Sequence, residues 1–222
     1  MAGVVSDLRP RGAWLPLALA AGLACAAQRP VVETRVLEID PPALRRIAVA
    51  PFAPSPRFKG DAATPQESGA AAADAAALTT RFVTEAFAAQ GFEVIPAGDL
   101  VTAFEAKGTP FPHGEVESAA RTAAQEFGAT ALLSGEVYRY RERQGGEMGA
   151  TRPASVGFTV TVHSATDARE LWSARFDETQ VALSENLFEA RRYPGTGSRW
   201  LSAAQLAQWG AEEIAKRLVE LR

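Results

Sequence analysis

The sequence contains few residues of the kinds that cross-link a fold or bind metals: one cysteine, Cys25, and two histidines, His113 and His163, among 222 residues. A single thiol cannot form a disulfide within the chain, so the stability of the fold has to come from packing. The two histidines lie far apart in the sequence with no cysteine beside them, which gives none of the spacings typical of a metal site. We therefore predict neither a metal nor another cofactor.

The chain also lacks an excess of charge of one sign. It has 23 lysines and arginines against 26 aspartates and glutamates, a formal net charge of -3 at pH 7. A protein that binds nucleic acid has to neutralise phosphates, so this balance argues against a nucleic-acid partner. Hydrophobic residues make up 47% of the chain, which is typical of a globular domain with a substantial core.

The most informative apolar run lies near the N-terminus. Residues 13–24 carry no charge, Arg9 and Arg11 precede them, and Cys25 follows them directly. A basic start, a short apolar stretch and small residues before a cleavage site indicate a secretory signal peptide, predicted here as residues 1–24. The run is shorter than the roughly 20 residues of a membrane-spanning helix, and Pro16 interrupts it. A cysteine at this place resembles the lipobox of bacterial lipoproteins, so Cys25 is the predicted lipidation site.

The lipobox is incomplete, because Gly22 stands where leucine is most common, whereas Ala24 fits the position before the cut. Secretory cleavage nearby without lipid is the main alternative. A lipidated Cys25 would carry several acyl chains, which anchor a protein stably in a membrane. By resemblance to the lipoprotein sorting rule, Ala26 in place of aspartate predicts the periplasmic face of the outer membrane. Residues 25–45 are then the lipidated cysteine and a flexible tether, in which residues 31–37 form a short edge strand.

The remaining residues, 46–222, are predicted to form one periplasmic domain of the α/β (α+β) class, with a mixed β-sheet covered by helices. Prolines predict a loop over residues 53–65, and Asp99 is a candidate N-cap. Ser202 with Gln205 forms a capping box at the start of the C-terminal helix, and the last two strands alternate in polarity like an antiparallel hairpin. The predicted strands cover residues 47–52, 92–96, 130–140, 155–163 and 171–183, and the helices cover 66–90, 99–107, 115–127 and the stretch after 202.

Several core and turn segments recur in the order of a known set of envelope proteins: Ile47 to Phe52 before a long helix, Gly91 to Ile95, Phe127 to Val137, and Leu171 to Ser173. In this the chain resembles the curli-secretion lipoproteins and the penicillin-binding-protein activator lipoproteins, which share a periplasmic α/β fold, and more distantly the N-terminal domain of the Tol-system β-propeller protein. The resemblance implies a membrane-anchored accessory protein that binds an envelope protein partner and catalyses no reaction.

Two groups of residues are candidates for binding that partner. Arg139, Arg141 and Arg143 alternate along a predicted strand end, so all three side chains project from one face. Arg191, Arg192 and Tyr193 form a second basic and aromatic group. Arginine and tyrosine are enriched at protein interfaces, although a solvated strand end with paired charges is the plainer interpretation of the first group.

Two alternatives to an accessory protein remain open. The first is an oligomeric channel subunit of the curli type, although neither residues 141–153 nor residues 184–199 hold two alternating strands of the length that a membrane barrel needs. The second is a serine hydrolase in which His163 and Asp167 activate Ser164 or Ser173, although the sequence has no Gly-x-Ser-x-Gly motif.

Overall fold

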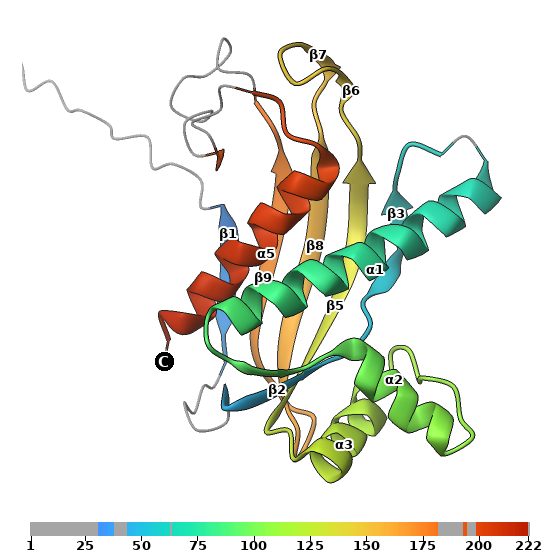
Figure 1. The fold of residues 1–222 in the computed structure, drawn as a ribbon, viewed down its shortest axis with the longest axis vertical. Helices are drawn as coiled ribbons and strands as arrows, with labels where there is room; N and C mark the ends of the chain where they lie inside the picture. Colours follow the sequence, from blue (N-terminus) through green and yellow to red (C-terminus); the bar gives the residue numbers. More distant parts are fainter. Residues whose placement is uncertain (1–30, 38–43, 63, 182–192, 195–198, 222) are drawn as a thin grey trace, which may run out of the picture.

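A computed structural model describes residues 31–37, 44–62, 64–181, 193–194 and 199–221 (Figure 1). It confirms a mixed α/β fold with a seven-stranded sheet, a late antiparallel hairpin and a C-terminal helix. The strands are β1 (Val32–Val36), β2 (Arg46–Val49), β3 (Ala53–Lys59), β4 (Glu93–Ile95), β5 (Ala131–Arg141), β6 (Gln144–Gly145), β7 (Ala150–Arg152), β8 (Ser155–Ser164) and β9 (Glu170–Thr179). The helices are α1 (Pro65–Ala89), α2 (Ala97–Ala106), α3 (Val116–Phe127) and α5 (Ala203–Val219).

The strands of the main sheet follow the order β1-β9-β8-β5-β2-β4, and β3 pairs with β5 beyond the end of β2. β2 runs parallel to β4 and β5, whereas β5, β8, β9 and β1 are antiparallel. Because β4 and β5 lie on opposite sides of β2, right-handed crossovers place α1 on one face of the sheet and α2 with α3 on the other. β6 and β7 form a separate small hairpin at the far end of β5 and β8.

The main core lies between the sheet and helices α1 and α5. Alternate residues of β8 point into it, namely Val156, Phe158, Val160 and Val162, and all four are completely buried. This alternation has the period of two that leaves the intervening side chains on the opposite face. Both covering helices begin with a capping box, Thr64 with Glu67 for α1 and Ser202 with Gln205 for α5.

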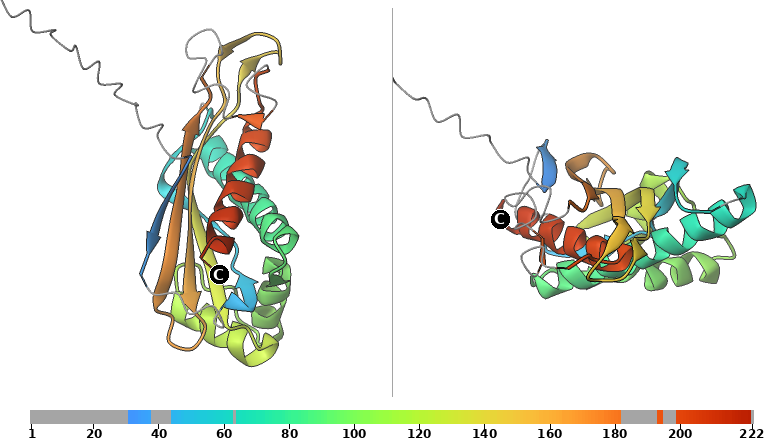
Figure 2. Two further views of the ribbon diagram at one scale, coloured as in Figure 1. Left: turned by 90° about the vertical axis from the view of Figure 1, so that its left-hand side faces the viewer. Right: turned by 90° about the horizontal axis from the view of Figure 1, so that it is seen from above.

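A smaller core lies on the opposite face and at one end only, where α2 and α3 pack on β2, β4 and the start of β5. Leu100 and Phe104 of α2 belong there to the same buried cluster as Ala48, Ile95 and Leu132. Beyond this end no described helix covers that face of β8, β9 and β1 (Figure 2). The sheet therefore has one covered face and one face that is open over most of its length.

The structure corrects the predicted loop at residues 53–65, of which Ala53–Lys59 form strand β3. Pro54 and Pro56 are tolerated because β3 pairs only with β5, and an edge strand does not need every backbone donor. Between β2 and β3, the Phe52 N–H donates to Thr80 Oγ1 at 3.0 Å instead of to a strand. The Phe52 ring lies directly against Gly135 of β5, where a Cβ atom would collide with it.

Three further predictions are refined by the structure. Asp99 does not cap α2, because Pro96 is the N-cap and Asp99 lies in the first turn, where a carboxylate interacts favourably with the helix dipole. The second strand of the hairpin ends at Thr179. The edge strand predicted within the tether exists as β1, so the sheet extends into residues 25–45. Cys25 lies outside the described residues.

The start of α5 is tied to two other parts of the fold. Gln180, just after β9, accepts a hydrogen bond from the Leu201 N–H at 2.7 Å and donates to the Arg199 carbonyl at 2.9 Å. The Glu142 carboxylate, just after β5, accepts from the Ala203 N–H at 3.1 Å. A carboxylate here satisfies a helix N–H that has no partner within the helix. Within the described part of the chain, every helix is too short or too polar to cross a bilayer.

Candidate binding face of the sheet

The open face carries polar side chains where the covered face carries apolar ones. On β8 these are Thr159, Thr161 and His163, each of which is partly exposed and follows a fully buried residue. The pairing register places polar residues of the adjacent strands beside them, namely Ser134 and Glu136 of β5, Ser173, Arg175 and Asp177 of β9, and Glu33 and Arg35 of β1. The period-two pattern of four strands thus assembles one continuous polar surface.

Three neighbouring cavities hollow this surface, with volumes of about 300, 460 and 600 Å³. The first lies against the loop before α3, the second over β9 and β1, and the third between β3 and β9. Thr159 lines all three and marks the centre of the open face. Such a row of cavities on a sheet gives a partner several places to insert side chains.

The cavity beside α3 contains both histidines of the chain. Ser134 Oγ lies 2.9 Å from His163 Nε2, and the ring of His113 makes an edge contact with Phe111, at 5.2 Å between centroids. Burial lowers the pKa of His163 below its ordinary value, against opposing effects of the Ala168 backbone and the Glu170 carboxylate. His163 is therefore neutral at pH 7 and can accept a hydrogen bond from the Ser134 hydroxyl.

The hydrolase triad suggested by the sequence is not formed. Among the described residues, no hydrogen bond joins His163 to Ser164 or Ser173, and Ser164 Oγ instead accepts from the N–H groups of Thr166 and Asp167. Ser164 follows His163 directly on β8, so the two side chains leave opposite faces of the strand. The serine that does contact His163 is Ser134. The two residues lie 29 positions apart in the sequence, so proximity along the chain does not indicate this pair. No group of three or more histidine, cysteine or acidic side chains in the described residues is placed to hold a metal.

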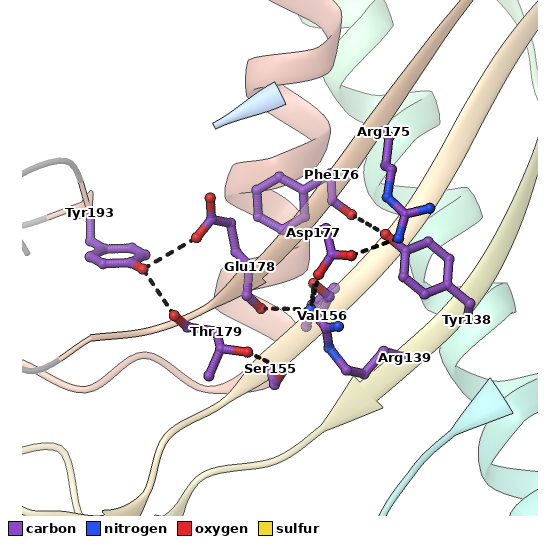
Figure 3. A network of polar contacts seen from close by, with 10 residues as sticks. All are labelled: Tyr138, Arg139, Ser155, Val156, Arg175, Phe176, Asp177, Glu178, Thr179 and Tyr193. Atoms are coloured by element: carbon purple, nitrogen blue, oxygen red, sulfur yellow. Dashed lines mark hydrogen bonds and ion pairs between the residues drawn. The ribbon is translucent and has the colours of Figure 1, made fainter. Parts of the chain in front are cut away.

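At the other end of the open face, charged and aromatic side chains form the network drawn in Figure 3. The register of β5 and β8 shifts between Val137 and Arg139, so Tyr138 and Arg139 both line the cavity of about 600 Å³. The Arg139 guanidinium donates to the carboxylate of Asp177 and to the carbonyl of Glu178. The Arg175 guanidinium donates to the same carboxylate at 2.7 Å and stacks over the Tyr138 ring at 4.4 Å.

These contacts set the protonation of the network. Burial raises the pKa of Asp177, but hydrogen bonds from Arg175 and Arg139 outweigh this and hold the pKa below its ordinary value. Burial, together with the nearby Asp177 carboxylate, raises the pKa of Tyr138. The phenol is therefore neutral, and its hydroxyl donates to the Phe176 carbonyl at 3.0 Å. Asp177 is thus a charged centre that fixes two arginines side by side.

Three of the predicted partner-binding residues, Arg139, Arg143 and Tyr193, have polar contacts within the fold. Arg139 belongs to the network around Asp177, and Arg143 donates to the Trp200 carbonyl. Tyr193 is 2% exposed, and its hydroxyl donates to the Glu178 carboxylate and to the Thr179 carbonyl. This corrects the expectation for Tyr193, because a side chain so deeply packed against Trp209 cannot be offered to a partner.

The role of the five predicted arginines in partner binding stays a prediction. Arg141 is partly exposed at the end of β5. Arg191 and Arg192 lie outside the described residues. Arg57, Lys59 and Arg175 are not among the predicted binding residues. The prolines of residues 53–65 predict a loop, so the sequence gives no sign that Arg57 and Lys59 lie on a strand beside β5.

The fold and the site define a single-domain mixed α/β protein whose sheet has one helix-covered face and one open, polar face. No protein-family model matches the chain, and no curated protein sequence matches it. Among solved structures it is similar to the PelC dodecamer from Paraburkholderia phytofirmans, with a TM-score of 0.44 and 17% identity over 82% of this chain and 92% of that one.

Two other similar structures are lipoprotein GNA1162 from Neisseria meningitidis and the LpoB C-terminal domain from Escherichia coli. The first has a TM-score of 0.36 and 18% identity, over 61% of this chain and 81% of that one. The second has a TM-score of 0.35 and 14% identity, over 62% of this chain and 84% of that one. At such low sequence identity the similarity is one of fold alone, and it assigns no role to any residue of this chain.

Proposed function

We propose that this protein is a lipoprotein of the bacterial envelope that binds another protein with the open face of its sheet and catalyses no reaction. Acylated Cys25 anchors it to the periplasmic face of the outer membrane. The domain then acts as an accessory module in envelope assembly or secretion. The observation that supports binding is the open face itself, on which four strands present polar side chains around Thr159 without a covering helix in the described residues.

The composition of this face suits a protein partner. It combines arginines, a tyrosine and hydroxyl side chains, of which arginine and tyrosine are enriched at protein interfaces. Arg175 is held by Asp177 and Tyr138, so little side-chain entropy would be lost when a partner binds it. Ser134 lies inside β5, whereas the nucleophilic serine of α/β-hydrolases lies at an exposed strand-to-helix turn. The Ser134–His163 pair therefore supports a hydrolase less well than it supports a shaped binding surface.

The anchor is tested by intact mass and membrane fractionation of the full chain, expressed in a two-membrane bacterium beside Cys25→Ser and Ala26→Asp variants. We expect the parent to begin at Cys25 with added acyl mass and to fractionate with the outer membrane. The Cys25→Ser variant should carry no acyl mass and leave the membrane fraction, whereas Ala26→Asp should keep its acyl mass and remain in the inner membrane. A parent chain that is cleaved but unacylated would contradict the anchor.

Binding is tested by placing a photo-crosslinking amino acid at Thr159 of the anchored protein in living cells. The matched control carries it at Gln208, which is exposed on α5 beside α1 and away from the open face. We expect a discrete adduct with another protein from position 159 and none from position 208. The mass of the purified complex separates an accessory module from a ring-forming channel subunit, since adducts between copies of this chain at position 159 would favour the ring. Absence of any adduct at position 159 would contradict binding through the open face.

A further inference from the structure

The cavity between β3 and β9 concentrates positive charge in a chain of net negative charge. Arg57 and Lys59 of β3, Arg139 of β5 and Arg175 of β9 line it together with two acidic residues, Glu136 and Asp177. We call the four cations, with Ser55 and Tyr138, the basic pocket. Two acidic side chains among four basic ones leave the pocket positive, whereas the whole chain has a formal net charge of -3.

The internal ion pairs do not neutralise this pocket. Asp177 is shared by Arg139 and Arg175, so one carboxylate serves two guanidinium groups. Arg57 and Lys59 have exposed side chains and form no ion pair within the described residues. The charge that remains available to a ligand is therefore mainly on the β3 side of the pocket, because Glu33 of β1 also lies beside Arg175.

The pocket is also organised before any ligand arrives. Arg175 lies against Tyr138 and is fixed by Asp177, while 48% of its side chain stays exposed. A guanidinium held in this way can donate its free N–H groups to a carboxylate, and such charge-assisted bonds are among the strongest polar contacts in proteins. Ser55 adds a hydroxyl on the opposite wall of the pocket, which is formed by β3.

The cavity beside α3, at the opposite end of the open face, limits the kind of anionic molecule that can bind the basic pocket. The cavity beside α3 is lined by Glu115, Glu136 and Glu170, and no lysine or arginine lines it. A membrane of anionic lipids or a polyanionic sugar lying across the face would be repelled there, because like charges brought together cost free energy. A protein segment, in contrast, can place an acidic group at the basic cavity between β3 and β9 and neutral or basic groups at the acidic cavity beside α3.

We propose that the basic pocket binds an acidic side chain or a C-terminal carboxylate of the protein partner, in a segment that lies across the open face. This inference rests on the proposed function, since it names the chemistry by which that partner is recognised. The carboxylate accepts hydrogen bonds from Arg175 and ion-pairs with Arg57 and Lys59. The segment continues past Thr159 toward the cavity that contains His163.

The test combines charge reversal with the crosslinker at Thr159. The double variant Arg57→Glu/Lys59→Glu inverts the pocket, and Arg45→Glu/Arg217→Glu applies the same change in net charge at exposed positions outside the open face. We expect adduct formation to fall about tenfold or more in the first variant and to stay within twofold in the second. Both variants should unfold at temperatures close to that of the parent. Crosslinking from Ser55 followed by mass spectrometry should identify a partner peptide that contains aspartate, glutamate or its own C-terminus.

The outcomes separate this inference from the proposed function. If the parent forms no adduct at position 159, binding by the open face is wrong. If the parent forms an adduct that Arg57→Glu/Lys59→Glu leaves unchanged, the open face binds a partner but the basic pocket does not recognise it. A third arm uses phosphatidylglycerol vesicles and the unanchored Cys25→Ser protein. Flotation with these vesicles that the pocket reversal abolishes would assign the pocket to a lipid surface and overturn the protein partner.

Discussion

Gly210, in the middle of α5, allows this helix to approach β9 more closely than any other residue would. A Cβ atom at this position would lie 2.7 Å from two ring atoms of Phe176. The ring cannot move aside, because it is completely buried and packs against Phe158, at 5.4 Å between centroids, and Trp209, at 5.7 Å. The substitution Gly210→Ala therefore introduces a methyl group into a space that is already filled.

The expected effect is the difference between two opposing contributions. Alanine is favoured over glycine in a helix interior by about 1 kcal/mol, partly because glycine has more freedom in the unfolded chain. Overpacking of a filled core costs about 1–3 kcal/mol. We expect Gly210→Ala to lower the free energy of unfolding by about 0–2 kcal/mol and the Tm by up to about 8 °C, given about 2–4 °C per kcal/mol for a domain of this size.

Gly69 on α1 provides the matched control. It lies in a helix and is exposed, and a Cβ atom there meets nothing within 4 Å. Gly69→Ala should therefore raise the free energy of unfolding by about 0.5–1 kcal/mol. Urea and thermal denaturation of both variants, followed by circular dichroism in the Cys25→Ser background, measure the two effects. A Gly210→Ala variant that gains as much stability as Gly69→Ala would refute the close approach of α5 to β9.

Two further predictions concern stability. Because burial lowers the pKa of His163 in the folded protein, the unfolded chain binds a proton first as pH falls, and stability is lost from about pH 6.5 downward through the folded pKa. The variant His163→Gln should not show this loss. In urea titrations the free energy of unfolding of the parent should therefore fall relative to that of the variant between pH 7 and pH 5. Parallel plots of the free energy of unfolding against pH would disprove the prediction. Ser202→Ala removes the side-chain cap of α5, in which Ser202 Oγ accepts from the Gln205 N–H at 3.1 Å, and should cost about 1 kcal/mol in the same assay.

Sequence patterns predicted those parts of the fold that depend on local preference. The capping box of Ser202 and Gln205 marks the start of α5, and the left-handed Gly128 ends α3 as expected of a glycine at that position. The period of two in residues 155–163 predicted both β8 and its buried side chains. In each case the signal lies within a few residues of the element that it specifies.

The features that escaped prediction depend on contacts between distant segments. β3 contains Pro54 and Pro56 and exists because β5 continues beyond the end of β2 and offers a free edge. The contact of Ser134 with His163 and the turning of Arg139 toward Asp177 both depend on the register of β5 against its neighbours. Pairing register is a property of two strands, so neither strand shows it alone.

The position of β1 has a consequence for how far the protein can reach. β1 is held along β9 from Val32 onward, so only the residues between Cys25 and Val32 separate the proposed anchor from the sheet. Even fully extended, these few residues span about 25 Å. The proposed anchor would therefore hold the domain close to the bilayer surface, so that a partner bound by the open face would also have to lie near the same leaflet.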